Sequence, residues 1–502
     1  MALVCACLAA WWWTPPARPH ARAPQETPVA FWAWREAMPS AQSWAQASQA
    51  TGARVLFARA GQWDWRAGRW QRIRAAQGKW APVSELHLVY NATRDGLAQL
   101  EKLDTAIFAK EIAAVFATDK IRAEGDGAKV VGLQLDIDAP TRLLPNYAKL
   151  LRAVRFEIGP TMKLSVTGLP TWMDSAMLPQ VLVEVDFWTP QCYGGRIPQR
   201  LNDAQPISSP DEVARSVARA RALDKQFYAG LAAYGYALLY DTNGRLGELR
   251  GDFNPARAVA DARFEMLERQ PFTAADGAAT GAWRYVLRAR EAGVLDGLAW
   301  QAGETLVLDV PGAESLRQTA RAARAEGGPA MLGLCIFRLP ETDDPTALKL
   351  PQIVAALKDA PPAPIQVLTN LTPAHRDPQG DARAWLLTVT NSSTTDALMG
   401  DGALVVTLAV PPGQARVSGG DGFAELAYLC GPEPSAAQPC SPRRANFLRL
   451  TRRAWHAGAK AAINLSSDTP PNAWRVYLAA RFDAAAPWQE TRALIPQESQ
   501  RP

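Results

Sequence analysis

The sequence predicts an α/β protein built on a (β/α)8 TIM-like barrel, with an α+β insertion on the barrel rim and a C-terminal β-sandwich. Strand-like apolar runs alternate with helical patterns through the first two thirds of the 502 residues, and this alternation is typical of a parallel sheet. Eight such strands over this length favour a closed barrel. Beyond the Pro-rich residues 361–364 only short strand-like runs remain, which are typical of a sandwich.

The barrel strands are predicted where aliphatic, β-branched or aromatic residues cluster. These runs are 29–34, 54–58, 86–90, 130–136, 163–167, 181–188, 227–234 and 331–337. Helices are predicted between them at 40–51, 93–116, 146–158 and 210–225. The last helix follows Ser209, a residue type that caps helix N-termini.

These elements divide the chain into a leader at 1–27, a barrel at 28–350 with its rim insertion at 236–330, and a β-sandwich at 361–502. The sandwich is expected to be Ig-like or carbohydrate-binding-like. In the insertion we expect a hairpin turn at 241–244, helices at 255–269 and 283–292, and a strand at 304–310. In the sandwich we expect strands at 365–368, 385–390, 403–410, 424–429, 446–450 and 474–482.

The N-terminal segment and the charge balance suggest where the protein acts. Residues 2–13 are apolar but too few to span a bilayer, so they resemble the core of a signal peptide. We expect an exported protein, periplasmic or associated with the cell envelope; a frayed cytosolic tail is the alternative. A faint lipoprotein-like pattern at 4–7 allows membrane attachment through this end. The net charge of +5 includes no long basic run, so no nucleic-acid partner is expected.

Cysteine and histidine usage argues against metal chemistry. Cys430 and Cys440 bracket a Gly/Pro/Ser-rich loop and could close a disulfide in an oxidising compartment, whereas Cys192 and Cys335 lie in apolar runs. The four histidines are scattered and no Cys-x-x-Cys pair exists, so we expect neither a zinc site nor a cofactor. Nucleophile-elbow and P-loop motifs are also absent from the sequence.

The run at 130–140 carries the strongest chemical signal. Strand alternation places Gln134, Asp136 and Asp138 on one face, with successive residues about 6.5–7 Å apart. Two acids in such a position repel and raise each other's pKa, which suits general-acid chemistry. The alternative is a strand whose last residues simply emerge into solvent.

Other polar and aromatic residues are expected beside these acids, because the catalytic groups of a barrel lie at the carboxyl ends of its strands. Asp186 and Tyr193 are the catalytic candidates from neighbouring strand ends. The candidates for substrate binding are Gln134, Trp172, Trp188, Gln191 and Tyr234. For Asp186 an equally good interpretation is a buried acid paired with other polar groups.

Tryptophan is concentrated near the N-terminus, with ten of the eighteen before residue 81. Flat indole faces stack well on sugar rings, so a polysaccharide or oligosaccharide partner is expected. Trp32 and Trp34 share one face of the first strand, and Trp63 and Trp65 form the pair expected to be exposed. Alternatively, any of them is a large core residue.

Three short motifs carry a family resemblance. Gln134-Leu-Asp136-Ile-Asp138 falls on the last three acidic positions of the pattern Asp-x-x-Asp-x-Asp-x-Glu. Gln191-Cys-Tyr193-Gly is similar to Met-x-Tyr-Asp, and the segment at 231–235 is similar to Leu-Gly-x-x-Tyr-Gly. Over roughly residues 28–350 the chain resembles the chitinase-like barrels of glycoside hydrolase family 18. It resembles more closely an uncharacterised bacterial domain-of-unknown-function family with such a barrel.

The resemblance implies a glycoside hydrolase acting on an envelope or extracellular polysaccharide. Asp138 would protonate the glycosidic oxygen, Asp136 would hold its charge or a substrate amide, and Tyr193 would hydrogen-bond the sugar. A separate possibility is a two-carboxylate site in which Asp138 faces Asp186 across the barrel.

The motifs also depart from the family pattern. Asp138 stands where the family has Glu, and Phe337 stands where it has a floor tryptophan. The alternative function is therefore a catalytically inactive barrel that binds glycans or acts as an envelope scaffold. A salt bridge from Asp138 to Arg142 or Arg338 would favour that alternative.

Overall fold

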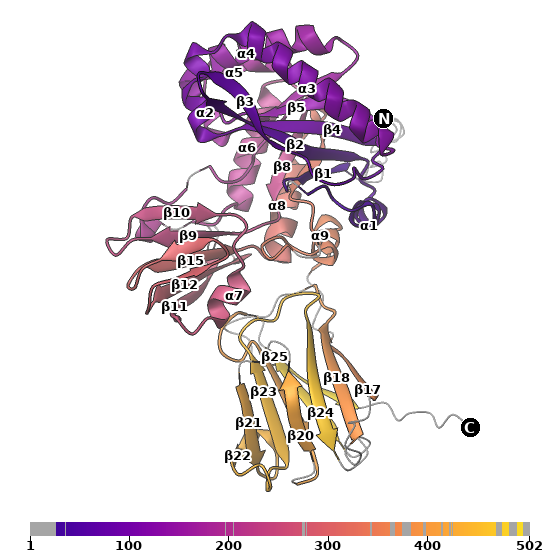
Figure 1. The fold of residues 1–502 in the computed structure, drawn as a ribbon, viewed down its shortest axis with the longest axis vertical. Coiled ribbons are helices and arrows are strands. Elements are labelled where there is room, and N and C mark those ends of the chain that lie inside the picture. The colour runs from indigo at the N-terminus through magenta and orange to yellow at the C-terminus, as the bar shows by residue number, and fades with distance from the viewer. Residues whose placement is uncertain are drawn as a thin grey trace, which may run out of the picture.

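A computed structural model shows the barrel, the rim insertion and the sandwich as three parts along the chain (Figure 1). The structure describes residues 27–494, except residues 36, 196, 204, 274–276, 278, 342–343, 362–366, 374–382, 395–397, 413–414, 421–422, 424, 468–473 and 481–488. The leader expected at 1–27 therefore lies outside the described residues except for Thr27.

Eight parallel strands close into a barrel, which confirms the predicted fold class. Each strand pairs with the next, and β1 pairs with both β2 and β16, so Ala30 lies opposite both Val55 and Cys335. In barrel order the strands are β1 (Val29–Ala33), β2 (Val55–Arg66), β4 (Glu85–Ala92), β5 (Val130–Asp136), β6 (Lys163–Gly168), β7 (Phe187–Pro190), β8 (Phe227–Ala232) and β16 (Met331–Phe337).

Helices cover the outside of this barrel (Figure 1). They are α1 (Ala41–Thr51), α2 (Arg94–Ala98), α3 (Thr105–Gly125), α4 (Leu144–Ile158), α5 (Leu178–Leu182), α6 (Pro210–Ala222), α8 (Ala313–Glu326) and α9 (Leu350–Leu357). Short 3-10 turns are η1 (Leu100–Lys102), η2 (Thr141–Leu143), η3 (Pro170–Trp172), η4 (Leu201–Asp203) and η5 (Pro434–Ala436). Ser209 accepts a hydrogen bond from the backbone nitrogen of Glu212, so it caps α6 as predicted.

Two element predictions in the barrel were wrong. The helix expected at 93–116 is divided, because the Asp104 side chain accepts hydrogen bonds from the backbone at the start of α3 and thereby begins a new helix. The strand expected at 181–188 is α5 followed by the short β7, because a brief apolar run suits a buried helix turn as well as a strand.

The barrel interior is packed at its amino end. Phe57, Phe187 and Tyr228 contact one another edge to face, and the His87 ring stacks on Phe57 with centroids 4.8 Å apart. Burial lowers the pKa of His87 to about 3, so this imidazole is neutral at physiological pH. These side chains fill the barrel below the level of the acids on β5.

A strand outside the barrel extends its sheet. β3 (Arg69–Ala75) pairs antiparallel with the long second half of β2. Trp63 on β2 and Trp70 on β3 pack on Phe108 of α3, with ring centroids 5.2 and 4.5 Å away. This hairpin therefore belongs to the hydrophobic layer between sheet and helices.

The rim insertion between β8 and α8 is a five-stranded antiparallel sheet in the order β10-β9-β15-β12-β11. Its elements are β9 (Tyr236–Tyr240), β10 (Leu246–Arg250), α7 (Pro255–Ala260), β11 (Phe264–Thr273), β12 (Ala279–Ala289) and β15 (Thr305–Val310), with the small hairpin β13 (Gly293–Leu295) and β14 (Leu298–Trp300). The predicted turn is present, with Asp241 accepting the Gly244 amide at 2.9 Å. The helix expected at 283–292 is instead strand, because Tyr285, Leu287 and Ala289 alternate into the insertion core.

The C-terminal region contains two antiparallel sheets around one apolar core, as the fold class predicted. One sheet is β17 (Val367–Pro373), β18 (Arg383–Asn391), β24 (Lys460–Ser467) and β20 (Ala415–Gly420). The other is β22 (Gln438–Pro439), β21 (Glu425–Cys430), β23 (Phe447–Arg452), β19 (Leu404–Ala409), β25 (Arg475–Ala480) and β26 (Gln489–Leu494). Cys430 and Cys440 form a disulfide with Cα atoms 5.8 Å apart. None of the helices in the described ranges is long and apolar enough to cross a membrane.

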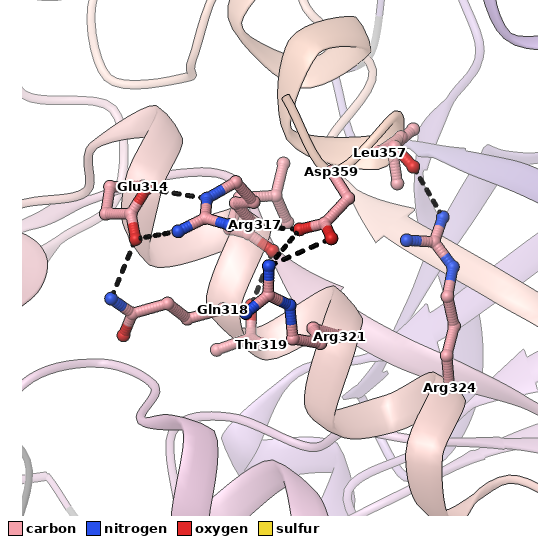
Figure 2. A network of polar contacts seen from close by, with 9 residues as sticks. Glu314, Arg317, Gln318, Thr319, Arg321, Arg324, Leu357 and Asp359 are labelled. Atoms are coloured by element: carbon pink, nitrogen blue, oxygen red, sulfur yellow. Dashed lines mark hydrogen bonds and ion pairs between the residues drawn. The ribbon is translucent and has the colours of Figure 1, made fainter. Parts of the chain in front are cut away.

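Figure 2 shows an ion-pair network that joins α8 to the residues just after α9. Arg317 pairs with Glu314 at 2.5 Å and with Asp359 at 3.0 Å, and Arg321 also pairs with Asp359 at 2.9 Å. Both arginines lie on α8, so the network holds the end of the last barrel helix against its neighbour. The chain leaves the barrel from this fixed point.

Candidate active site

A pocket opens at the carboxyl ends of the barrel strands. Its volume is about 130 Å³, and it is lined by side chains from β1, β5, β6, β7, β8 and β16 and from the turns that follow some of these strands. The lining residues are Trp32, Trp34, Asp136, Asp138, Thr167, Thr189, Gln191, Tyr193, Gly230, Tyr234, Cys335 and Phe337.

Asp136 is the last residue of β5 and is buried in the pocket wall. Thr167 on β6 donates a hydrogen bond from its hydroxyl to Oδ1 at 2.5 Å. Burial raises the pKa of Asp136 above its ordinary range, while this hydrogen bond and the positive charge of Arg59 act against the rise. The pKa of the Asp136 carboxyl is thus raised, and the group keeps its proton to a higher pH than an ordinary aspartate does.

Asp138 follows two residues later and is exposed to the pocket. Its pKa is raised by the protein around it and by the charge of Asp136. Asp138 and Asp136 are both carboxylates, so ionisation of one favours the protonated form of the other. The two groups therefore favour a state in which one of them keeps its proton.

The carboxyl of Asp138 has no ion-pair partner among the residues that the structure describes. Arg142 pairs instead with Glu101 at 3.1 Å, and Arg338 pairs with the buried Asp344 at 2.6 Å. The salt bridge that would have favoured an inactive barrel is thus not formed with either arginine.

Aromatic rings form the other side of the pocket. Trp32 and Trp34 stack with centroids 5.3 Å apart and an interplanar angle of 18°, and Phe337 lies 5.1 Å from Trp32. Tyr193 stacks on Phe337 at 5.8 Å, and Tyr234 meets the same ring edge-on at 4.9 Å. Phe337 is therefore the centre of a continuous aromatic surface that faces the acids.

Gln134 supports this surface from below and does not line the pocket. It is fully buried, and its Oε1 accepts a 2.8 Å hydrogen bond from Nε1 of Trp32. Its amide nitrogen donates to the hydroxyls of Ser165 and Thr189, both at 3.3 Å. Its side chain is thus used in fixing Trp32, whereas we expected it to contact substrate.

Arg59 is a site residue that sequence reasoning missed. It lies in the barrel on β2, and its guanidinium sits over the Trp34 ring, 4.4 Å from the centroid. The available signal was a charged residue directly after the apolar run at 54–58, which is ordinarily read as the point where a strand reaches solvent. Its charge also acts on Asp136, as noted above.

Residues 92–270 match the family model described as "Domain of unknown function (DUF3142)". This confirms the predicted resemblance to an uncharacterised family. The DUF3142 match runs from the last residue of β4 into β11, so it includes Asp136, Asp138 and Tyr193.

Several solved structures are similar to the chain at low sequence identity, and no curated protein matches it. The spore cortex-lytic enzyme SleL of Bacillus cereus is 16% identical, with a TM-score of 0.41, covering 66% of this chain and 74% of that one. A chitinase from Chromobacterium violaceum is 15% identical with a TM-score of 0.40, covering 66% and 98%. A glycoside hydrolase family 18 N-acetylglucosaminidase from Paenibacillus barengoltzii is 14% identical with a TM-score of 0.41, covering 66% and 99%.

The structure places Asp186, within the DUF3142 match, away from the pocket. It precedes β7, where Arg155 pairs with it at 2.5 Å and the backbone nitrogen of Leu164 donates to it at 2.7 Å. Leu164 is at the amino end of β6, which is the end of the barrel opposite the pocket. Asp186 therefore does not face Asp138. The expected two-carboxylate site, with Asp138 opposite Asp186, is not formed.

Four of the tryptophans proposed to contact substrate also lie outside the pocket lining. Trp63 and Trp188 are buried in the layer between sheet and helices, and Trp65 is half-buried against it. Trp172 is buried and donates its Nε1 hydrogen to the carbonyl of Ala139 at 2.8 Å. Their large apolar surfaces are used in packing, although Trp172 also fixes the backbone next to Asp138.

The pocket lining brings Trp32, Trp34, Gln191, Tyr193 and Tyr234 together with the two acids. Within the described ranges no group of three or more His, Cys, Asp or Glu side chains is placed to hold a metal ion.

Proposed function

We propose that the protein is a glycoside hydrolase that cleaves a polysaccharide of the envelope or the surroundings, with Asp138 as general acid. One observation carries this proposal: Asp138 lies next to the buried Asp136, has no ion-pair partner among the described residues, and lines an aromatic-walled pocket at the carboxyl end of a closed barrel. This is the end at which barrels place their catalytic groups.

The acids are suited to proton transfer. A general acid must hold a proton near the working pH and release it to the leaving oxygen. The charge of Asp136 favours the protonated form of Asp138, and exposure to the pocket lets Asp138 reach a substrate. The Thr167 hydrogen bond holds Asp136 in one orientation beside it.

The pocket walls are suited to a sugar. The C–H faces of a pyranose stack on aromatic rings, here those of Trp32, Trp34 and Phe337. The Tyr193 hydroxyl and the Gln191 amide supply polar groups that can bond sugar hydroxyls or an amide substituent.

Asp186 lies at the barrel end opposite the pocket, so it is not placed to attack the anomeric carbon. Asp136 and Asp138 are the acids among the described residues that line the pocket, and both come from β5 and its end. No second carboxylate faces Asp138 there, so we assign the attack on the anomeric carbon to the acetamido oxygen of the substrate itself. Asp138 donates its proton to the departing oxygen, and Asp136 stabilises the positive charge that develops on the amide.

The compartment and partner belong to the same proposal. The Cys430–Cys440 disulfide supports export, because such bonds persist in oxidising compartments. We propose a periplasmic or envelope-associated protein, attached to the membrane through its N-terminus if the lipoprotein-like pattern is used.

The test is oligosaccharide release by the full chain from a panel of amino-sugar and neutral polysaccharides. Asp138→Asn should abolish release, whereas the matched control Asp186→Asn should retain it. Absence of release from every substrate by a folded protein that still retains glycans would refute hydrolysis and favour a glycan-binding scaffold.

A further inference from the structure

The loop between β7 and α6 connects the pocket to the rim insertion. Gln191 and Tyr193 at its start line the pocket. The β7–α6 loop (residues 191–209, of which 196 and 204 are not described) then contacts β9, β12 and β15 of the insertion sheet. Its two ends are joined where the backbone nitrogen of Gly194 donates to the carbonyl of Ile207 at 2.7 Å.

Three side chains of the insertion bind the main chain of this loop. The Tyr240 hydroxyl on β9 donates to the carbonyl of Pro198 at 3.1 Å. Arg284 on β12 donates through Nη2 to the carbonyl of Leu201 at 2.9 Å. Asp309 on β15 accepts from the backbone nitrogen of Ile207 at 2.8 Å. We call Tyr240, Arg284 and Asp309 the loop clamp.

Backbone bonds strengthen the same contact. The Leu201 nitrogen donates to Gly244 and the Leu246 nitrogen donates to Gln199, both at 3.0 Å. The turn between β9 and β10 thus pairs with the loop over a short stretch around Gln199 and Leu201.

An apolar cluster continues from the clamp to the pocket. Ile207 and Tyr240 pack in one buried cluster with Tyr193 and Tyr236, and Phe337 packs against it. Because Tyr193 stacks on Phe337, movement of the loop relative to the insertion would displace a pocket wall.

Burying the charged side chains of the loop clamp costs free energy of folding, so their presence at these positions favours a positioning role. Arg284 and Asp309 are direct cross-strand partners and both are buried. Each makes one hydrogen bond to the loop main chain, through Nη2 of Arg284 and Oδ2 of Asp309. Among the described residues, Nε of Arg284 and Oδ1 of Asp309 have no hydrogen-bond partner, and no ion pair joins the two side chains. Apolar residues at such positions would ordinarily stabilise a sheet at least as well as buried charges.

We propose that Tyr240, Arg284 and Asp309 are positioning residues through which the rim insertion sets the place of Tyr193 in the pocket wall. The insertion then contributes to the site without touching the reacting atoms. The predicted effect of the loop clamp on turnover rests on the proposed hydrolysis, whereas its predicted effect on protection of the β7–α6 loop does not. The two predictions can therefore fail separately.

The first experiment measures hydrogen exchange of backbone amides at 193–208 in the full chain. Arg284→Met and Asp309→Ala should accelerate exchange there about tenfold, since each removes a buried hydrogen bond. Asp309→Asn keeps an acceptor for the Ile207 nitrogen and should restore protection. Asp252→Ala, an exposed aspartate of the same insertion, is the matched control and should change nothing.

The second experiment couples the clamp to Tyr193. In kcat/KM for oligosaccharide release, Arg284→Met should cost less when Tyr193 is already Phe than in the wild-type background. If the protein binds glycan without cleaving it, the same comparison is made with glycan retention. If the loop clamp only stabilised the fold, Arg284→Met would have the same effect in the Tyr193→Phe background as in the wild type.

Unchanged exchange at 193–208 in folded Arg284→Met and Asp309→Ala would overturn the proposal. Faster exchange combined with fully independent effects of Arg284→Met and Tyr193→Phe would overturn it as well. Tyr240→Phe is nearly isosteric and removes one clamp bond, so it carries the test if Asp309→Ala does not fold.

Discussion

Nε1 of Trp32 donates a 2.8 Å hydrogen bond to the buried side chain of Gln134, which in turn bonds the hydroxyls of two neighbouring strands. This relationship joins the aromatic wall of the pocket to the strand that carries the acids. Trp32 is thus fixed from the barrel interior, and its side chain lines the pocket.

Gln134→Met tests this support. The substitution keeps the volume but leaves the Trp32 nitrogen and two hydroxyls without their partner, so we expect a loss of about 1–3 kcal/mol in the free energy of unfolding. Urea unfolding checks it. A variant as stable as the wild type would show that water replaces the lost bonds.

Trp63→Ala and Trp34→Ala should separate packing from binding. Trp63 is buried on Phe108, so its removal should lower the free energy of unfolding by about 3–5 kcal/mol while glycan retention by the folded fraction persists. Trp34 lines the pocket and is half-buried, so its removal should reduce retention with a smaller loss of stability. The opposite pattern in a pull-down and an unfolding curve would contradict both assignments.

The acid pair makes a prediction about pH. Asp138 must be protonated to act, so hydrolysis should fall as the pH rises through its raised pKa. Asp136→Asn removes the neighbouring charge and so lowers the pKa of Asp138. The alkaline limb of the residual kcat/KM should therefore move to lower pH. If the alkaline limb of the kcat/KM profile does not move in Asp136→Asn, the charge of Asp136 does not affect the pKa of Asp138.

Asp309 should make stability depend on pH. Burial raises the pKa of Asp309 to about 7 from an ordinary value of 3.8, so the folded state binds the proton more tightly than the unfolded state. This contribution is fully present below about pH 4 and is lost as the pH rises through about 7. Asp309→Asn should flatten the fall in unfolding free energy over that range, as unfolding at a series of pH values would show.

Reduction of the Cys430–Cys440 disulfide should destabilise the sandwich. The bond closes a short loop, for which chain entropy gives about 2–3 kcal/mol. Thermal unfolding with and without a reductant measures this, and Cys430→Ser/Cys440→Ser is the matched variant. An unchanged transition for the sandwich would show that the unfolded chain gains little freedom when the bond is broken.

The order of the barrel strands could be predicted well because turn residues delimit the apolar runs. The runs at 130–136 and 331–337 match β5 and β16 at both ends. The prediction failed where a run was short or rich in arginine. The segment at 181–188 suits a helix turn as well as a strand. The alternation in β12 was hidden by Arg284 and Arg288 on its second face, although Arg284 is buried.

The site was predictable where barrel geometry determines it, and not where packing does. The ends of parallel strands meet at one rim, which brought Asp136, Asp138 and Tyr193 together. The strand expected at 181–188 begins only at Phe187. Asp186 therefore lies before its amino end, whereas the expected bounds placed it near the carboxyl end. Nor does periodicity distinguish an exposed indole from a buried one, as Trp63 demonstrates.

The pairing of β1 with β16 governs when the barrel can form during synthesis. Val29 lies opposite Leu334, and the whole insertion is made between them. Ribosomes add about 5–20 residues per second, so the first strand waits on the order of 15–60 s for its final neighbour. Throughout that interval β1 lacks this neighbour, so the nascent chain keeps an unpaired sheet edge that could pair with other chains.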